Sequence, residues 1–125
     1  MTVNQISYHI RGAIFDVYNN LGPGLLESVY HAAMIHELDK RGLKVESKKK
    51  LDVMYDGKKL PLDFELDLLV EDKVIVELKS VLEMKNVFYL QTKTYLKIAN
   101  KKLGILVNFN CEDITENIHR IVNGL

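Results

Sequence analysis

Two apolar segments decide the fold of this chain: Phe64-Glu-Leu-Asp-Leu-Leu-Val70 and Val74-Ile-Val-Glu-Leu-Lys-Ser80. The polar residues 71–73 join them. Short runs rich in Leu, Val and Ile on both sides of a three-residue polar link are typical of a β-hairpin. The simplest register pairs Val70 with Val74 across this loop.

That register brings two acids together. Asp67 and Glu77 are each three residues from their end of the loop, so they lie opposite one another. Opposed residues on one face have Cβ atoms roughly 4.5–5.5 Å apart, and carboxylates that close repel unless a cation or a proton lies between them. Lys79 shares the face of Glu77 because the side-chain period of a strand is two. The pattern predicts a site for a hard divalent cation; the alternative is a solvated sheet face on which the lysine neutralises the glutamate.

Composition sets limits on the class of protein. The 125 residues are 47% hydrophobic and 27% charged, which predicts one globular domain spanning residues 1–125. The formal net charge of zero argues against a protein that coats nucleic acid by charge alone. Cys111 is the only cysteine, which fits a reducing compartment, and neither a signal peptide nor a membrane span is apparent. We therefore expect a cytoplasmic protein with no membrane partner.

The positive charge is unevenly spread. Six basic residues lie between positions 40 and 50, against the single acid Glu46: Lys40, Arg41, Lys44, Lys48, Lys49 and Lys50. One interpretation is a solvated helix end and strand edge, where lysines discourage edge-to-edge pairing. The other is a rim that contacts phosphate, formed by Lys48, Lys49 and Lys50.

Hydrophobic periodicity predicts the other elements. Helices are expected at residues 3–20, 25–41 and 86–100, and a last one after Asp113. Strands are expected at 43–54, 59–70, 74–80 and 103–109, with an Asp-Gly turn between the first two. The fourth strand follows a helical crossover, so the prediction is an α/β (α+β) fold with a four-stranded mixed sheet flanked by helices.

The apolar sides of two helices are also expected from the spacing. The second helix presents Leu26, Val29, Ala33 and Leu38, and the third presents Val87, Leu90, Thr94 and Ile98. The four histidines, His9, His31, His36 and His119, show no ligand spacing and are interpreted as surface or boundary residues.

The order of elements, with Asp67 on the second strand and Glu77-Leu-Lys79 on the third, resembles the PD-(D/E)XK nuclease superfamily. The proline that often precedes the aspartate is replaced by Leu66. The resemblance implies a restriction-endonuclease-like αβββαβ core that carries its site on the central hairpin.

A second resemblance covers nearly the whole chain. Gly24-Leu-Leu-Glu27-Ser-Val-Tyr30 spells Gly-x-x-Glu-x-x-Tyr. With Asp67-Leu-Leu-Val-Glu71, the Ile-Val-Glu-Leu-Lys of 75–79, Gln91-Thr-Lys-Thr-Tyr95 and the strand at 103–109, it is similar to the small prokaryotic GxxExxY family within the same superfamily. In this motif Tyr30 is expected to be a packing ring whose hydroxyl finds a polar partner.

These resemblances imply a Mg²⁺-dependent nuclease, in which Mn²⁺ can substitute. The metal ligands would be the carboxylates of Asp67 and Glu77, the backbone carbonyl of Leu78 and, directly or through water, Glu27. Lys79 would complete the catalytic group, either by positioning or deprotonating the attacking water as a general base or, as we favour, by stabilising charge on the phosphorus. The alternative is a catalytically silent nuclease-fold module that binds nucleic acid or a protein partner.

The resemblance to the exonuclease branch of the superfamily also implies a substrate-contacting pair. Gln91 and Tyr95 are four residues apart on one helix and share a face. The expected partner is nucleic acid, DNA rather than RNA, and a homodimer would serve either function. Glu65 is out of place on a strand that grips DNA, because its charge repels phosphate.

Overall fold

The computed structural model describes residues 1–125, apart from the side chain of residue 63. The elements follow the order α1 (Val3–Leu21), α2 (Glu27–Lys40), β1 (Val45–Tyr55), β2 (Lys58–Val70), β3 (Val74–Lys79), α3 (Asn86–Ala99), β4 (Leu103–Asn108), a short 3₁₀ helix η1 (Ile114–Asn117) and β5 (Ile118–Val122). The five strands form one sheet in chain order, β1-β2-β3-β4-β5. β3 and β4 pair in parallel and the other neighbouring strands are antiparallel, so the expected mixed sheet and helical crossover are confirmed.

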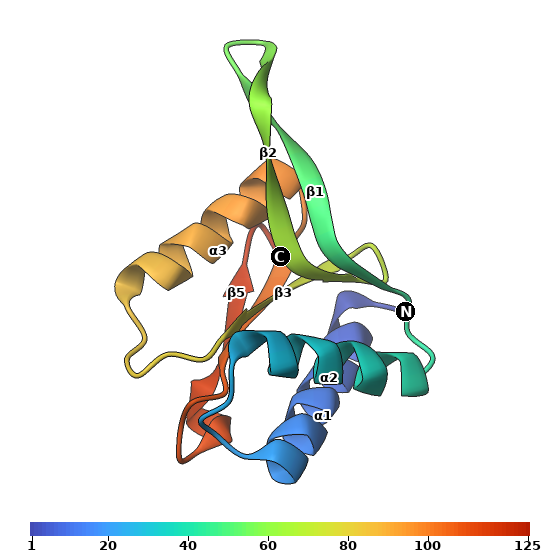
Figure 1. The fold of residues 1–125 in the computed structure, drawn as a ribbon. Coiled ribbons are helices and arrows are strands. Elements are labelled where there is room, and N and C mark those ends of the chain that lie inside the picture. The colour runs from blue at the N-terminus through green and yellow to red at the C-terminus, as the bar shows by residue number, and fades with distance from the viewer.

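The sheet has helices on both faces (Figure 1). The α1/α2 side packs on the larger core cluster, into which β3 sends Val74, Val76 and Leu78. The α3 side packs on a smaller cluster that includes Ile75 and Leu96. The odd-numbered residues of β3 therefore share the α3 side, which places Glu77 and Lys79 there. Among the described residues, no helix is long and apolar enough to cross a membrane.

The predicted register of the β2–β3 hairpin is confirmed, but the paired region is short. Val70 pairs with Val74, and the β2–β3 ladder ends at the pair of Leu68 and Val76. Beyond that pair β2 stays with β1 alone, and the two strands rise out of the body as a ribbon (Figure 1). We call the point where β2 leaves β3 the fork; Asp67 is the first residue past it on β2.

A kink in β1 lies beside the fork. The β1–β2 ladder pairs Ser47 with Leu68 and Lys49 with Leu66, and it passes over the position between them, where Lys48 has φ of +50°. Lysine is rarely found in this left-handed region, because its Cβ crowds the following carbonyl. Leu66 and Leu69 are three residues apart yet pack in the same cluster on the α3 side, so the alternation of β2 slips once at the kink.

The expected last helix is wrong, and so is the count of four strands. Asp113 does cap a helix, accepting a hydrogen bond from the Thr115 amide, but that helix is η1, only four residues long. The chain then continues as β5, antiparallel to β4. Every residue of β4 is buried, so the polar backbone on its outer side needs a partner, and β5 supplies it.

The expected apolar sides of two helices also need correction. In α2 the fully buried residues are Tyr30, Met34 and Leu38, whereas Leu26 is 75% exposed. In α3, Thr92 and Leu96 face the sheet, while the expected stripe lies outside, with the exposed side chains Val87, Leu90 and Ile98. In α2 the spacing correctly predicts Leu38 but misses Tyr30 and Met34, and in α3 it selects the outer side.

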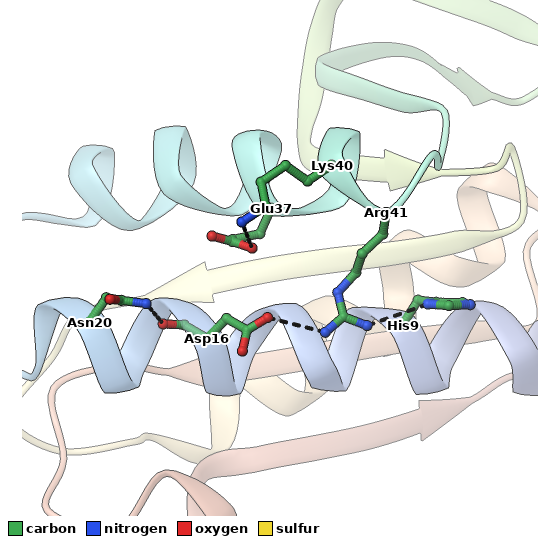
Figure 2. A network of polar contacts seen from close by, with 6 residues as sticks. All are labelled: His9, Asp16, Asn20, Glu37, Lys40 and Arg41. Atoms are coloured by element: carbon green, nitrogen blue, oxygen red, sulfur yellow. Dashed lines mark hydrogen bonds and ion pairs between the residues drawn. The ribbon is translucent and has the colours of Figure 1, made fainter.

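A polar clasp joins the end of α2 to the middle of α1 (Figure 2). The Arg41 guanidinium donates to Asp16 Oδ2 at 3.1 Å and lies 3.4 Å from His9 Nδ1. A Cβ at Gly12 would lie 2.6 Å from the same guanidinium, so glycine leaves the room that this side chain occupies. The clasp fixes how α2 lies on α1, and α2 carries part of the candidate site.

The loop between α1 and α2 is tied down by Tyr30. Its ring stacks on Phe109 with centroids 4.5 Å apart, as the expected packing role requires. Its hydroxyl donates to the Gly22 carbonyl at 2.7 Å and accepts from the Leu25 amide at 3.1 Å. Tyr30 thereby holds the start of α2, where Glu27 lies.

Replacing Tyr30 with phenylalanine tests this tie. Tyr30→Phe keeps the ring and removes both hydrogen bonds, so the free energy of unfolding should fall by about 1–2 kcal/mol. Urea denaturation measures it. Tyr8→Phe is the matched control, because Tyr8 is 72% exposed and should change stability little. Equal stability of Tyr30→Phe and wild type would contradict the role given to the hydroxyl.

Candidate active site at the fork

Asp67 is held at the fork through its side chain. Its Oδ2 accepts a hydrogen bond from the Leu78 amide at 2.8 Å. The Leu78 side chain is buried in the α1/α2 core, so only the backbone of this residue reaches the site. Asp67 and Glu77 are not ladder partners, because the paired region stops one residue short. The two carboxyl groups are nevertheless close enough for the charge of Asp67 to raise the pKa of Glu77.

Glu77 is the most unusual residue of the fold. It is 5% exposed, and its Oε1 is buried with no hydrogen-bond partner among the described residues. Burial raises the pKa of Glu77 to about 9, and the charge of Asp67 adds to the rise, while Lys79 opposes it. Glu77 therefore binds a proton more tightly than an ordinary glutamate does.

Lys79 closes the same side of β3. Its Nζ lies 4.6 Å from the centroid of the Phe88 ring on α3. The ring face favours the charged ammonium. The positive charge of Lys79 acts against the rise in the pKa values of Glu77 and Glu27. Lys79 is therefore close enough to both side chains to affect their charge.

Glu27, the first residue of α2, faces the fork from the other layer. Partial burial raises the pKa of Glu27 and the charge of Asp67 raises it further, against Lys79 and His31. Glu27 and Asp67 both line a cavity of about 310 Å³, together with Ser28, His31 and Lys48. The structure thus brings Glu27 together with the acids of the hairpin.

The three lysines of the predicted phosphate rim do not all lie at the cavity. Lys48 lines the cavity beside Asp67. Lys49 forms an ion pair with Glu46, with 3.7 Å between Nζ and Oε2. Lys50 is exposed and pairs in register with Glu65, which is also exposed. Of the three, Lys48 alone lines this cavity, and Glu65 is not among its lining residues.

The pair on α3 is divided as well. Tyr95 packs against Phe64 with ring centroids 4.9 Å apart, and the charges of Glu77 and Asp67 add to the effect of burial in raising the pKa of its hydroxyl. Tyr95 is therefore near the acids. Gln91 is exposed on the outer part of the same helix.

The interpretation of the histidines missed one residue of the site. His31 Nε2 lies 3.1 Å from the backbone carbonyl oxygen of Asp67 and 3.3 Å from Ser47 Oγ. The available signal was its position four residues after Glu27, which puts both on one face of α2. A search for metal-ligand spacing among histidines does not find a residue that contacts backbone.

The available ligands fit a hard divalent cation that takes only a few of its ligands from the protein. Among the described residues, no group of three or more His, Cys, Asp or Glu side chains is placed to hold an ion. Mg²⁺ keeps several waters and takes one or two carboxylates. Asp67 and Glu77 supply those two, and the unpartnered Glu77 Oε1 is the acceptor that an ion would satisfy.

The raised pKa of Glu77 gives a pH dependence in metal-free protein. The folded state binds the proton more tightly than the unfolded state, so stability should fall as pH rises from about 4.5 towards 9. Glu77→Gln should remove this decline and exceed wild type at pH 8 by about 1–3 kcal/mol. Urea denaturation with chelator at several pH values measures it.

Glu83→Gln serves as the control for that experiment, because Glu83 is exposed and lies outside the sheet. It should follow the wild-type curve. A Glu77→Gln curve parallel to wild type across this range would show that Glu77 is not buried in the way described.

Comparison with known proteins agrees with this fold. The crystal structure of SSO0001 superposes with a TM-score of 0.59 at 19% sequence identity, covering 79% of this chain and 51% of that chain. That likeness concerns the fold, and this chain spans about half the length of SSO0001. No curated protein matches the sequence. The family model described as PD-(D/E)XK nuclease superfamily matches residues 4–121, so the chain belongs to the PD-(D/E)XK nuclease superfamily.

Proposed function

We propose that this protein is a metal-dependent nuclease that hydrolyses phosphodiester bonds, with DNA as its substrate. One observation carries the proposal: Glu77 Oε1 is buried beside a second carboxylate, with no hydrogen-bond partner in the part of the chain that the structure describes, on the strand that ends at Lys79. A structural role gives no reason to bury two acids together, since an isolated buried carboxylate is costly. A bound cation removes that cost and gives the arrangement a use.

The ion would be held by Asp67, Glu77 and the backbone carbonyl of Leu78, with Glu27 binding one of its waters. Mg²⁺, or Mn²⁺ in its place, would polarise a phosphate oxygen and lower the pKa of a bound water. Because the Asp67 carboxylate also accepts the Leu78 amide, it is oriented before any ion arrives. Such preorganisation is what a metal site requires of its ligands.

Lys79 would act as a fixed positive charge. Its Nζ lies 4.6 Å from the centroid of the Phe88 ring, and the face of an aromatic ring attracts a positive charge. A protonated lysine cannot accept a proton, so we assign it to stabilising charge that develops on the phosphoryl oxygens. The general-base role is disfavoured for the same reason.

The substrate would be contacted locally rather than by a broad positive surface, since the net charge is zero. Lys48 in the cavity is the first contact to phosphate, and Lys49 and Lys50 extend the path along β1. On α3, Tyr95 near the acids and Gln91 outside them would contact the nucleic-acid backbone.

The proposal also includes the finer features expected from the sequence. Residues 1–125 form one nuclease domain of the GxxExxY branch, a cytoplasmic protein that assembles as a homodimer. Gly24, Glu27 and Tyr30 support the branch, because each has a physical role here. Gly24 has φ of +94°, Tyr30 holds the loop, and Glu27 faces Asp67.

The metal is tested by thermal stability. Mg²⁺ or Mn²⁺ should raise the melting temperature of wild type, because an ion that binds only the folded state adds about 2.7 kcal/mol at one hundred times its Kd. Asp67→Ala should abolish this response, whereas Asp52→Ala on the ribbon should keep it. No response in wild type would remove the metal-dependent nuclease.

Lys79 is tested by separating turnover from metal binding. Lys79→Met should abolish cleavage of labelled single-stranded, duplex and branched DNA and keep the melting response to Mn²⁺. Lys85→Met, an exposed lysine before α3, should cleave like wild type. Loss of the metal response in Lys79→Met would contradict the assigned role.

The same assay decides between the nuclease and a silent binding module, which the neutral net charge favours. A wild type that binds Mn²⁺ and nucleic acid but cleaves neither DNA nor RNA supports the module.

A further inference from the structure

His31 contacts the site through the backbone of Asp67. Its Nε2 lies 3.1 Å from the Asp67 carbonyl oxygen, in a half-buried contact between α2 and β2. A carbonyl oxygen only accepts hydrogen bonds, so Nε2 carries the proton and donates. The contact is therefore available to the neutral ring protonated at Nε2 and to the charged ring alike.

The kink explains why that carbonyl needs a donor. The β1–β2 ladder passes over the position that Lys48 and Asp67 share, and Lys48 is in the left-handed region there. A half-buried backbone carbonyl that loses its ladder partner must find another donor. His31 supplies it from α2, and Ser47 Oγ, 3.3 Å from the same nitrogen, borders the contact from β1.

Asp67 is consequently held from two sides. Its backbone is held by α2 through His31, and its carboxylate is held by β3 through the Leu78 amide at 2.8 Å. Because His31 and Glu27 are on the same face of α2, the His31 bond also fixes the distance of Glu27 from Asp67.

We propose that His31 is a positioning residue, which orients the Asp67 carboxylate for the ion by holding the Asp67 backbone at the kink. It touches neither ion nor substrate in this role. The proposal rests on the metal site of the proposed function and names a residue that neither sequence motif contains.

Mn²⁺ affinity, measured by isothermal titration calorimetry, is the first readout. His31→Leu removes the donor and fills similar space, and loss of a residue that orients a ligand typically weakens metal binding about 10–100-fold. His31→Gln, which carries an amide N–H, should recover most of that loss. His36→Leu is the matched control, because His36 is exposed on the same helix and should bind Mn²⁺ like wild type.

A second readout needs no metal. Because the Leu78 amide donates to Asp67 Oδ2, we expect it to be protected from hydrogen exchange in metal-free protein. His31→Leu should speed exchange of this amide, measured by NMR, while the Val74 and Val76 amides on the same strand keep their rates. If leucine prevents folding, His31→Ala repeats both measurements.

The outcomes are distinct. Unchanged Mn²⁺ affinity and unchanged Leu78 exchange in His31→Leu overturn the proposal. Weak binding in both His31→Leu and His31→Gln, with Leu78 still protected, also overturns it, because the histidine would then act on the ion itself. A wild type without Mn²⁺ binding removes the proposed nuclease, and Leu78 exchange in the metal-free protein still decides the role of His31.

Discussion

The fork depends on a single electrostatic problem: a second carboxyl group is buried against the first. Glu77 belongs to a strand that is otherwise apolar and inaccessible, and at 5% exposure its charge has little solvent to screen it. The surrounding groups reduce this cost in part. The Leu78 amide satisfies one oxygen of Asp67, and the Lys79 ammonium opposes the negative charge. Among the described residues, Glu77 Oε1 still has no hydrogen-bond partner, and this unsatisfied oxygen points to a ligand.

Two departures from ordinary local structure meet at this point. Lys48 takes a backbone conformation that lysine disfavours, and Glu77 leaves a polar atom without a partner. Natural sequences break such rules mainly at functional sites, where other contacts compensate. Single departures also occur elsewhere, at the buried Glu46 Oε2 and at the positive φ of Glu71, whereas other local rules hold: Thr2 forms a capping box with Gln5 at the start of α1, and the Asp-Gly turn joins β1 to β2.

The hairpin that carries the site could be predicted because its determinants are local. A three-residue link between two apolar runs sets the register of Val70 and Val74, which brings Asp67 and Glu77 near one another although the ladder ends before them. The remaining errors come from tertiary context. The segment at 114–122 has helical spacing, but the open side of β4 draws it into a strand. No sequence motif identifies His31, because its partner is a backbone carbonyl rather than a side chain. The kink that leaves this carbonyl open to His31 has no evident signal in the sequence.

The strand order also has a consequence for how the chain reaches this structure. Neighbours in the sheet are neighbours in sequence, so β1, β2 and β3 can assemble as successive hairpins with short loop closures. The parallel pairing of β3 with β4 must wait for α3 to cross over, and such non-local pairing is slow. We therefore expect the two acids to come together early on the folding pathway, before α3 and β4 enclose them and while water can still screen their charge.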